Sequence, residues 1–257
     1  MSGEVGAPMI EIAEVSKRYG AARAVLEAID LRVVKEEFVT LIGASGCGKS
    51  TMLKLISGLT APSGGAIRVD GMTPANAREI VSYIFQDATL LPWRTVRQNV
   101  GLGLELEGAS KERRTERTSA LLELVGLGHV ADAYPRELSG GMKMRVSIAR
   151  ALTTSPRLLL MDEPFAALDE MSRDRLNEEL LRLRAEQNWT AVFVTHSVAE
   201  AVFLSTRIVV LAPNPGRIHA TIAVELPFPR TAALRVTPAF EELVARVSVA
   251  LRSALSQ

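Results

Sequence analysis

The chain has 257 residues, of which 47% are hydrophobic, and its formal net charge is +1. This length suits one large α/β domain or two small ones, and the near-neutral charge excludes the strongly basic footprint of a nucleic-acid-binding protein. Its single cysteine, Cys47, excludes an internal disulfide, and no apolar run approaches the roughly 20 residues of a membrane-spanning helix. The N-terminus lacks a signal-peptide pattern, so we expect a subunit of the reducing cytosol.

The first predicted elements are strands. Residues 9–42 alternate between hydrophobic and polar, and we expect them to build a small antiparallel sheet. Within this stretch, residues 38–42 are apolar and β-prone, so they predict a buried strand. Another strand is expected over residues 66–70, after a turn rich in glycine and proline.

A glycine-rich loop follows the strand at 38–42 and precedes a helix expected over residues 50–56. It fits G-x-x-x-x-G-K-[ST] at every fixed position. Glycines let the backbone close around phosphate oxygens, and the helix N-terminus favours anions. Lys49 is expected to reach the β- and γ-phosphates of a nucleotide, and the Ser50 hydroxyl to ligate Mg²⁺. Cys47 is either a thiol whose alkylation blocks ATP or a spacer whose backbone alone matters, and we favour the spacer. The loop consists of Gly43, Ala44, Ser45, Gly46, Cys47, Gly48, Lys49 and Ser50.

Residues 89–157 are helical in pattern and contain a second glycine pair. Leu138 and Ser139 precede Gly140 and Gly141 at an expected helix start, which supplies another set of amides able to hold phosphate. One nucleotide already has its own loop at 43–50. We therefore expect the second set to serve the nucleotide of a partner copy.

Two acids end the next apolar run. Residues 158–161 predict a strand buried on both faces, and Asp162 and Glu163 follow it. Open α/β sheets bind ligands at the carboxyl ends of strands, so Asp162 is placed to hold a magnesium shell and Glu163 to polarise the attacking water. Alone, the pair would be better explained as solvated acids before a proline turn. Residues 158–212 alternate strand and helix, which predicts a parallel sheet.

In this order, the motifs resemble those of the ATP-binding subunit of an ATP-binding cassette (ABC) transporter, over about residues 9–225. The resemblance implies an α/β fold: a P-loop NTPase (RecA-like) core with an antiparallel β subdomain and an inserted helical subdomain. It implies a single ABC ATPase domain across 1–257. The core would comprise 1–88 and 158–230, the helical subdomain 89–157, and a C-terminal amphipathic helix 237–253.

The resemblance also assigns residues that the chemistry alone leaves open. Tyr19 matches the aromatic that stacks on adenine, and Gln86 matches the glutamine that touches the metal and senses the membrane subunit. Residues 167–169 match the loop that crosses the dimer interface, and His196 matches the histidine at the γ-phosphate. The expected catalytic residues are Glu163, His196 and Lys49. The expected metal ligands are Ser50, Gln86 and Asp162. The expected ATP contacts are Tyr19, residues 43–51 including Thr51, Gln86, Ser139, Gly140, Gly141 and Asp169.

Residues 88–96 and Met142 resemble the nitrate/sulfonate/taurine group of importers. That likeness implies ATP and Mg²⁺ as cofactors and a homodimer at the cytoplasmic face of the inner membrane. Its partners would be membrane permease subunits docked near Gln86 and residues 92–94 and, indirectly, a periplasmic or lipid-anchored substrate-binding protein. Nucleic acid is not expected as a partner. Met144 and Ser197 depart from the family pattern, where glutamine and aspartate are usual.

The substrate stays open among nitrate, a sulfonate, taurine, a thiamine precursor and an aromatic acid, because this subunit does not touch it. The alternative functions are a non-transport ABC ATPase of translation or repair, an importer subunit for an unrelated small substrate, and a nucleotide sensor that does not hydrolyse. Proteins of the first kind carry two cassettes or long coiled-coil insertions, which this chain lacks. Glu163 together with His196 argues against the sensor.

Overall fold

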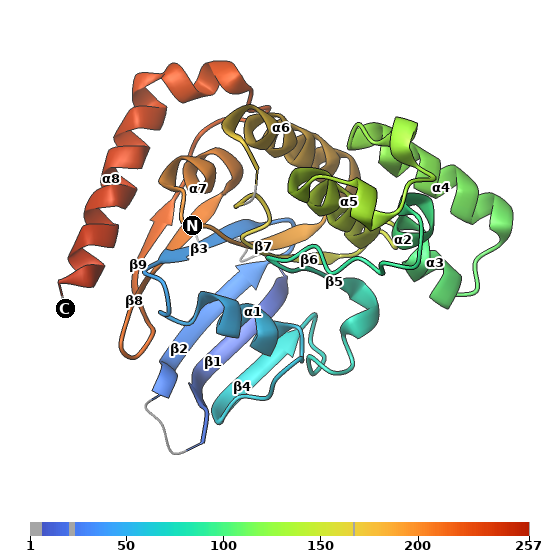
Figure 1. The fold of residues 1–257 in the computed structure, drawn as a ribbon. Helices are drawn as coiled ribbons and strands as arrows, with labels where there is room; N and C mark the ends of the chain where they lie inside the picture. The colour runs from blue at the N-terminus through green and yellow to red at the C-terminus, as the bar shows by residue number, and fades with distance from the viewer. Residues whose placement is uncertain (1–6, 21–23, 167, 257) are drawn as a thin grey trace.

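The computed structural model describes residues 7–20, 24–166 and 168–256, and it arranges them as two sheets flanked by helices (Figure 1). The strands are β1 (Pro8–Arg18), β2 (Ala24–Val34), β3 (Phe38–Gly43), β4 (Gly64–Val69), β5 (Val81–Ile84), β6 (Leu158–Asp162), β7 (Thr190–Val194), β8 (Arg207–Ala212) and β9 (Arg217–Ala223). The α-helices are α1 (Lys49–Ile56), α2 (Val96–Val100), α3 (Leu102–Leu106), α4 (Lys111–Leu124), α5 (Gly140–Leu152), α6 (Glu170–Gln187), α7 (Val198–Leu204) and α8 (Pro238–Leu255).

The smaller sheet is antiparallel and has the order β2-β1-β4. The prediction of an antiparallel sheet over residues 9–42 is therefore right for its first two strands and wrong for the third. Phe38–Gly43 is β3 of the other sheet. The physical reason is burial: β3 is covered on both faces, whereas β1 and β2 alternate between buried and exposed residues.

The larger sheet has the order β5-β6-β7-β3-β8-β9. Its first five strands run parallel, and β9 runs antiparallel to β8. Neither β5 nor β9 was predicted from the sequence. β5 has only four residues, and both strands are largely half-exposed or exposed, so neither forms a long apolar run. The parallel strands β3, β6 and β7 are buried along their whole length, which accounts for their unbroken apolar runs.

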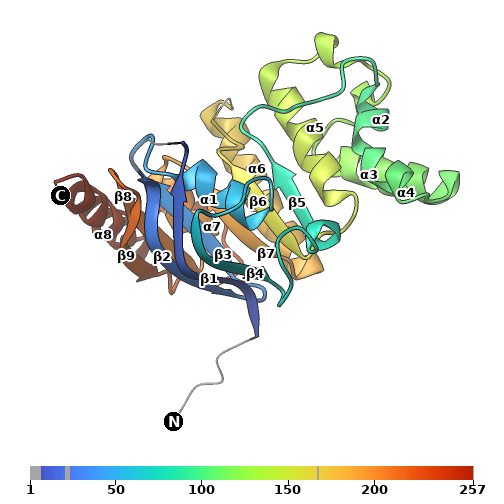
Figure 2. The ribbon, with the colours of Figure 1, turned by 90° about the horizontal axis from the view of Figure 1, so that it is seen from below.

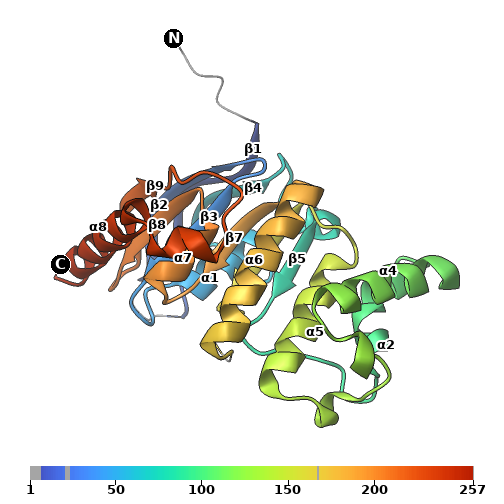
Figure 3. The same cartoon turned by 90° about the horizontal axis from the view of Figure 1, so that it is seen from above.

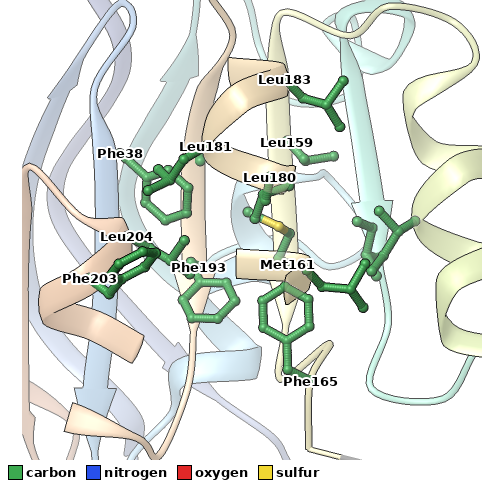
Figure 4. Packing of buried hydrophobic residues seen from close by; sticks show 14 of the residues in the cluster. Phe38, Leu159, Met161, Phe165, Leu180, Leu181, Leu183, Phe193, Phe203 and Leu204 are labelled. Carbon is green, nitrogen blue, oxygen red and sulfur yellow. The ribbon is translucent and has the colours of Figure 1, made fainter. Parts of the chain in front are cut away.

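Alternate residues of these central strands pack into two cores, one on each face of the sheet. Leu158 and Leu160 point to the face covered by α1 and the smaller sheet, whereas Leu159 and Met161 point to the opposite face. Helices α5, α6 and α7 cover this second face (Figure 3). Figure 4 shows Leu180 of α6 lying over Met161 of the sheet. Leu176, Leu180 and Leu183, spaced three or four residues apart on α6, form a stripe that is buried there.

Helices α2 to α5 form a group that projects to one side of the sheets (Figure 2). The group is inserted between β5 and β6 in the chain, although these two strands are neighbours in the sheet. The guanidinium of Arg150 on α5 donates to the carbonyl oxygens of Ala88 and Thr89, at 3.0 and 2.9 Å. The helical group is therefore tied to the segment that leaves β5.

The C-terminal helix, expected over residues 237–253, is α8 and packs against its own domain. Phe240, Val247 and Ala254 recur every seven residues and are buried against the larger core. Within the described residues, no helix combines the length and the apolar character that would let it cross a membrane.

Candidate functional site

Four neighbouring strands of the larger sheet deliver the predicted site residues to one edge. In spatial order these strands are β5, β6, β7 and β3, all parallel. Gln86 follows β5, Asp162 and Glu163 stand at the end of β6, His196 follows β7, and the phosphate loop (residues 43–50) follows β3. The carboxyl edge of a parallel sheet is where such folds bind ligands. Residues as far apart in sequence as Gly43 and His196 therefore converge because of strand order.

The phosphate loop is closed around the ammonium group of Lys49. This side chain is 5% exposed, and its Nζ donates to the carbonyl oxygens of Gly43 and Ala44 at 2.9 and 2.8 Å. Gly48 has φ 98°, and a Cβ there would lie 2.5 Å from a methyl carbon of Leu26, so no other residue fits. Lys49 then opens α1, whose first amides face the loop. The loop therefore combines a helix N-terminus with a buried ammonium group, which is the polarity that a phosphate group needs.

Cys47 is fully buried in this loop, and burial raises the pKa of its thiol. A protonated, inaccessible thiol is a poor nucleophile. This favours the interpretation of Cys47 as a spacer over that of a reactive group.

Ser50 and Asp162 meet beside the loop. The Ser50 hydroxyl donates to Oδ1 of Asp162 at 2.8 Å, and the phenol of Tyr83 on β5 donates to Oδ2 at 3.2 Å. Asp162 is 6% exposed. Hydroxyl and carboxylate oxygens are the hard ligands that Mg²⁺ prefers, and a site of this kind uses one or two protein groups together with phosphate oxygens. The donor set therefore fits magnesium.

Glu163 and His196 form the second contact of the site. Nε2 of His196 lies 2.7 Å from Oε1 of Glu163, and the two side chains are 52% and 14% exposed. Glu163 has φ 49°, in the left-handed region that costs most residues about 1–3 kcal/mol. Its amide is held by the carbonyl of Val194 at 3.0 Å. This backbone twist directly after β6 turns the carboxylate toward the end of β7, where His196 stands.

A pocket of about 280 Å³ adjoins this pair and contains a buried polar network. Glu200 is 5% exposed; its carboxylate accepts from the Thr195 hydroxyl at 2.5 Å and pairs with Nε of Arg173 at 3.2 Å. Burial raises the pKa of Glu200. Ser197 caps α7 by accepting from the amide of Glu200, so serine replaces the usual aspartate with another capping residue.

Thr51, in the first turn of α1, is half-buried, and the other predicted ATP contacts outside the phosphate loop on the core side are exposed. Tyr19 is 49% exposed, with Nζ of Lys17 4.7 Å from its ring centroid, and Gln86 is exposed one residue after Phe85. Asp169 is exposed and caps α6 by accepting from the amide of Ser172 at 2.9 Å. Ala167 lies outside the described residues.

The signature segment (residues 138–141) lies on the helical group rather than among the strand ends. Ser139 and Gly140 are exposed at the start of α5, where the Ser139 hydroxyl accepts from the amide of Met142 at 3.3 Å. A Cβ at Gly141 would lie 2.9 Å from Leu168, so this segment touches the loop before α6. Within the described chain, no hydrogen bond or ion pair joins residues 138–141 to the phosphate loop, Asp162, Glu163 or His196. Met144, further along α5, is buried.

Sequence reasoning missed four residues that contact the site. None of them lies in a sequence motif that would mark it as a site residue: these residues are Tyr83, Arg173, Thr195 and Glu200. Thr195 and Glu200 flank His196 closely enough that their proximity is a usable signal. Tyr83 is 79 residues from Asp162 and meets it only because β5 pairs with β6.

Comparison with known proteins identifies this arrangement. The family model described as ABC transporter matches residues 26–166. The nitrate import ATP-binding protein NrtD of Synechocystis sp. is 43% identical over 221 residues, which cover 85% of this chain and 83% of that protein. The bicarbonate transport ATP-binding protein CmpC of Synechococcus elongatus is 49% identical over 211 residues, covering 80% of this chain but 31% of that longer protein. The dimeric structure of MJ0796, a bacterial ABC transporter cassette, superposes with a TM-score of 0.79 at 31% identity, over 85% of this chain and all of that one.

The chain belongs to the ABC transporter family and is an ATP-binding subunit of it. The predicted P-loop α/β fold is confirmed by the likeness to the cassette structure. Membership makes the chain an ATPase that uses ATP with Mg²⁺, as the motifs predicted. A further solved structure of the MJ0796 cassette, at TM-score 0.78, is a dimeric post-hydrolysis state bound to ADP and Pi.

Proposed function

We propose that this chain hydrolyses ATP to drive an importer of a small anion, of the kind that the nitrate/sulfonate/taurine group transports. One observation supports these residues as the ATPase site. Four strand ends converge there, Ser50 contacts Asp162, and Glu163 contacts His196. The anion is supported by the 43% identity with the nitrate import protein and the 49% identity with the bicarbonate transport protein.

Binding of the nucleotide is the task of the phosphate loop. Lys49 exchanges its two carbonyl contacts for the β- and γ-phosphate oxygens, and Tyr19 stacks on adenine. The other loop residues and Thr51 contribute backbone amides at the start of α1, which favour the negative charge of the phosphates. Ser50, Asp162 and Gln86 would hold Mg²⁺, which when bound would offset the negative charge of the phosphates.

Hydrolysis falls to Glu163. Its carboxylate accepts a proton from water as the water oxygen attacks the γ-phosphorus and the bond to the β,γ-bridging oxygen breaks, releasing ADP and phosphate. Nε2 of His196, 2.7 Å from Glu163, orients that carboxylate and can also reach the γ-phosphate. The pair is a general base with its positioning group.

We further propose that two copies share their nucleotides. The exposed Ser139 and Gly140 and the half-buried Gly141 of one copy face the ATP held by the phosphate loop of the other, with Asp169 at the interface between them. The dimeric MJ0796 cassette supports this arrangement. ATP binding then closes the dimer, and hydrolysis lets it open.

Permease subunits would dock near Gln86 and Trp93, at the cytoplasmic face of the membrane, with a substrate-binding protein acting on the other side. Trp93 is 70% exposed, and the adjacent Arg94 is held by a two-pronged ion pair with Glu105, with N–O distances of 2.6 and 3.1 Å. Arg150 connects this segment to α5 and hence to the signature segment. The proposal divides the chain into a core of 1–88 and 158–230, a helical subdomain of 89–157 and a C-terminal helix.

The test is transport. The chain is purified with the permease that accompanies it and reconstituted in vesicles, and ATP-driven uptake of labelled nitrate, bicarbonate, taurine and another sulfonate is measured. We expect uptake of one anion, its loss in Trp93→Ala, and no change in Val249→Ala, an exposed apolar control on α8. Turnover that no permease accelerates, with no uptake of any anion, would favour the alternative of a non-transport ABC ATPase.

A further inference from the structure

Tyr83 is placed to orient the acid at the centre of the magnesium site. It lies on β5, opposite Leu160 of β6 and two residues before Asp162 in register. Side chains of a strand alternate between its faces, so Tyr83 and Asp162 both project toward the face that α1 covers. Ser50 opens the first turn of that same helix. Three elements thus bring one phenol, one carboxylate and one hydroxyl together.

The two oxygens of Asp162 are divided between two donors. Ser50 donates to Oδ1 at 2.8 Å and Tyr83 donates to Oδ2 at 3.2 Å. A carboxylate with one donor can rotate about its Cβ–Cγ bond, whereas donors at both oxygens fix the plane of the group. The lone pairs that remain then point in set directions.

The chemistry of the second donor matters as well. A lysine or arginine at position 83 would offset the negative charge of Asp162, which a magnesium site needs. A phenol donates a hydrogen bond and leaves that charge in place. An ordinary phenol has a pKa of about 10 and so carries its proton throughout the physiological range.

The ring of Tyr83 has its own contact, which leads toward Gln86. It stacks on Phe85 with centroids 4.2 Å apart and an interplanar angle of 27°. Phe85 immediately precedes Gln86, the other proposed metal ligand. The stack therefore braces the segment that leaves β5 against the residue that holds Asp162.

We propose that Tyr83 is a positioning residue for the magnesium site, which fixes the Asp162 carboxylate through its phenol and braces the Gln86 segment through its ring. The inference rests on the proposed role of Asp162. Its action is on the metal and not on the nucleotide, since within the described residues Tyr83 makes no hydrogen bond to the loop at 43–50 and is connected to Ser50 only through Asp162, to which both donate.

The test is Tyr83→Phe, which removes the donor and keeps the ring. Partners behind a metal ligand are worth about 10–100-fold in metal affinity, and we expect about a tenfold rise in the Mg²⁺ concentration that gives half-maximal ATP turnover. A fluorescent ATP analogue provides the second readout. Its affinity in EDTA should be unchanged, and the gain in affinity on adding Mg²⁺ should shift to higher Mg²⁺ by the same factor. The matched control is Tyr134→Phe, which loses a phenol on the exposed surface.

Asp162→Asn separates the two levels of the proposal. If Asp162→Asn shifts the Mg²⁺ dependence and Tyr83→Phe does not, Tyr83 is not a positioning residue, although the site stands. If Asp162→Asn shifts nothing, the proposed magnesium site is itself wrong. Equal loss of analogue affinity by Tyr83→Phe with and without Mg²⁺ would also overturn the inference, because it would show a general distortion of the loop.

Discussion

The phosphate loop and the signature segment both present backbone amides at the start of a helix, yet their surroundings differ. Around the loop, Lys49 donates to backbone carbonyls of the loop, Ser50 donates to Asp162, and Glu163 contacts His196. Ser139 and Gly140 lie exposed on the helical group, and the described chain places none of its catalytic groups against them. In the proposed shared site, one chain assembles the half that binds and cleaves ATP, and the half that caps the nucleotide comes from another copy.

The largest expected effect is on ATP turnover and concerns the half of the site around the phosphate loop. In Glu163→Gln, the carboxylate that accepts the proton of water is lost, and the amide that replaces it has nearly the same shape. ATP turnover should fall by about 10²–10⁴-fold, as for loss of a general base, while ATP affinity stays unchanged. Single-turnover hydrolysis and analogue binding measure the two quantities. A fall of less than about tenfold would remove Glu163 from the role of base.

Lys49→Ala tests binding in the same half. A hydrogen bond to a charged group is worth about 1.5–3 kcal/mol, which corresponds to roughly 10–100-fold in affinity for ATP. Titration with a fluorescent analogue measures it. Lys54→Ala, an exposed lysine on the same helix, is the matched control and should bind normally. Equal affinities for the two variants would mean that the loop at 43–50 is not the phosphate site.

Ser139→Ala should separate the two halves. Loss of this cap of α5 costs about 0.5–2 kcal/mol of unfolding free energy, typically about 1. Because Ser139 lies away from the phosphate loop of its own chain, the affinity of the monomeric variant for ATP should stay within about twofold of the wild-type value. Urea unfolding and analogue titration check the two numbers. A large loss of monomer affinity would show that Ser139 serves the nucleotide of its own chain.

Cys47→Ala gives the smallest effect and sharpens the role of the loop. Removing one buried sulfur should cost about 1 kcal/mol of stability and leave ATP affinity unchanged. The pKa of Cys47 is raised in the folded state, so its stabilisation is present below the pKa of the unfolded thiol, 9.0, and is lost as pH rises from there through the folded value. Wild type should therefore lose stability relative to Cys47→Ala above about pH 9. Parallel urea curves at pH 7 and 10 test this, and a constant difference would contradict it.

The sequence predicts those parts of the site that depend on contiguous residues. The strand, loop and helix around Lys49 were predicted because they are contiguous, and each has a local signal in burial pattern or glycine placement. The contacts of Ser50 and Glu163 depend on which strands are neighbours, which no local pattern encodes. β5 was not predicted because it has only four residues, three of them half-buried, which is too short and too uniform to show a clear period. Tyr83 lies on that strand, so its bond to Asp162 could not be anticipated.

The same reasoning explains why the signature segment was predicted better than its surroundings. Ser139 before two glycines is a local helix start, and the structure has Ser139 capping α5. The network of Arg173 and Glu200 is not local, since it joins α6 to α7 beside His196. Sequence motifs therefore named the groups proposed to touch ATP, and the fold was needed to find the residues that contact those groups.

The shared site is the central claim, and complementation between subunits tests it most directly. In a Glu163→Gln background, which keeps ATP bound, a tagged Lys49→Ala subunit is mixed with a differently tagged Ser139→Arg subunit, and heterodimers are isolated through both tags. A matched control pairs the Lys49→Ala, Ser139→Arg double variant with an otherwise unaltered subunit. The shared site predicts an ATP-dependent heterodimer from the first mixture, which retains one intact site, and none from the control, which retains none. The reverse pattern, or no ATP-dependent heterodimer from the first mixture at any ratio while unaltered Glu163→Gln subunits dimerise, would contradict the claim.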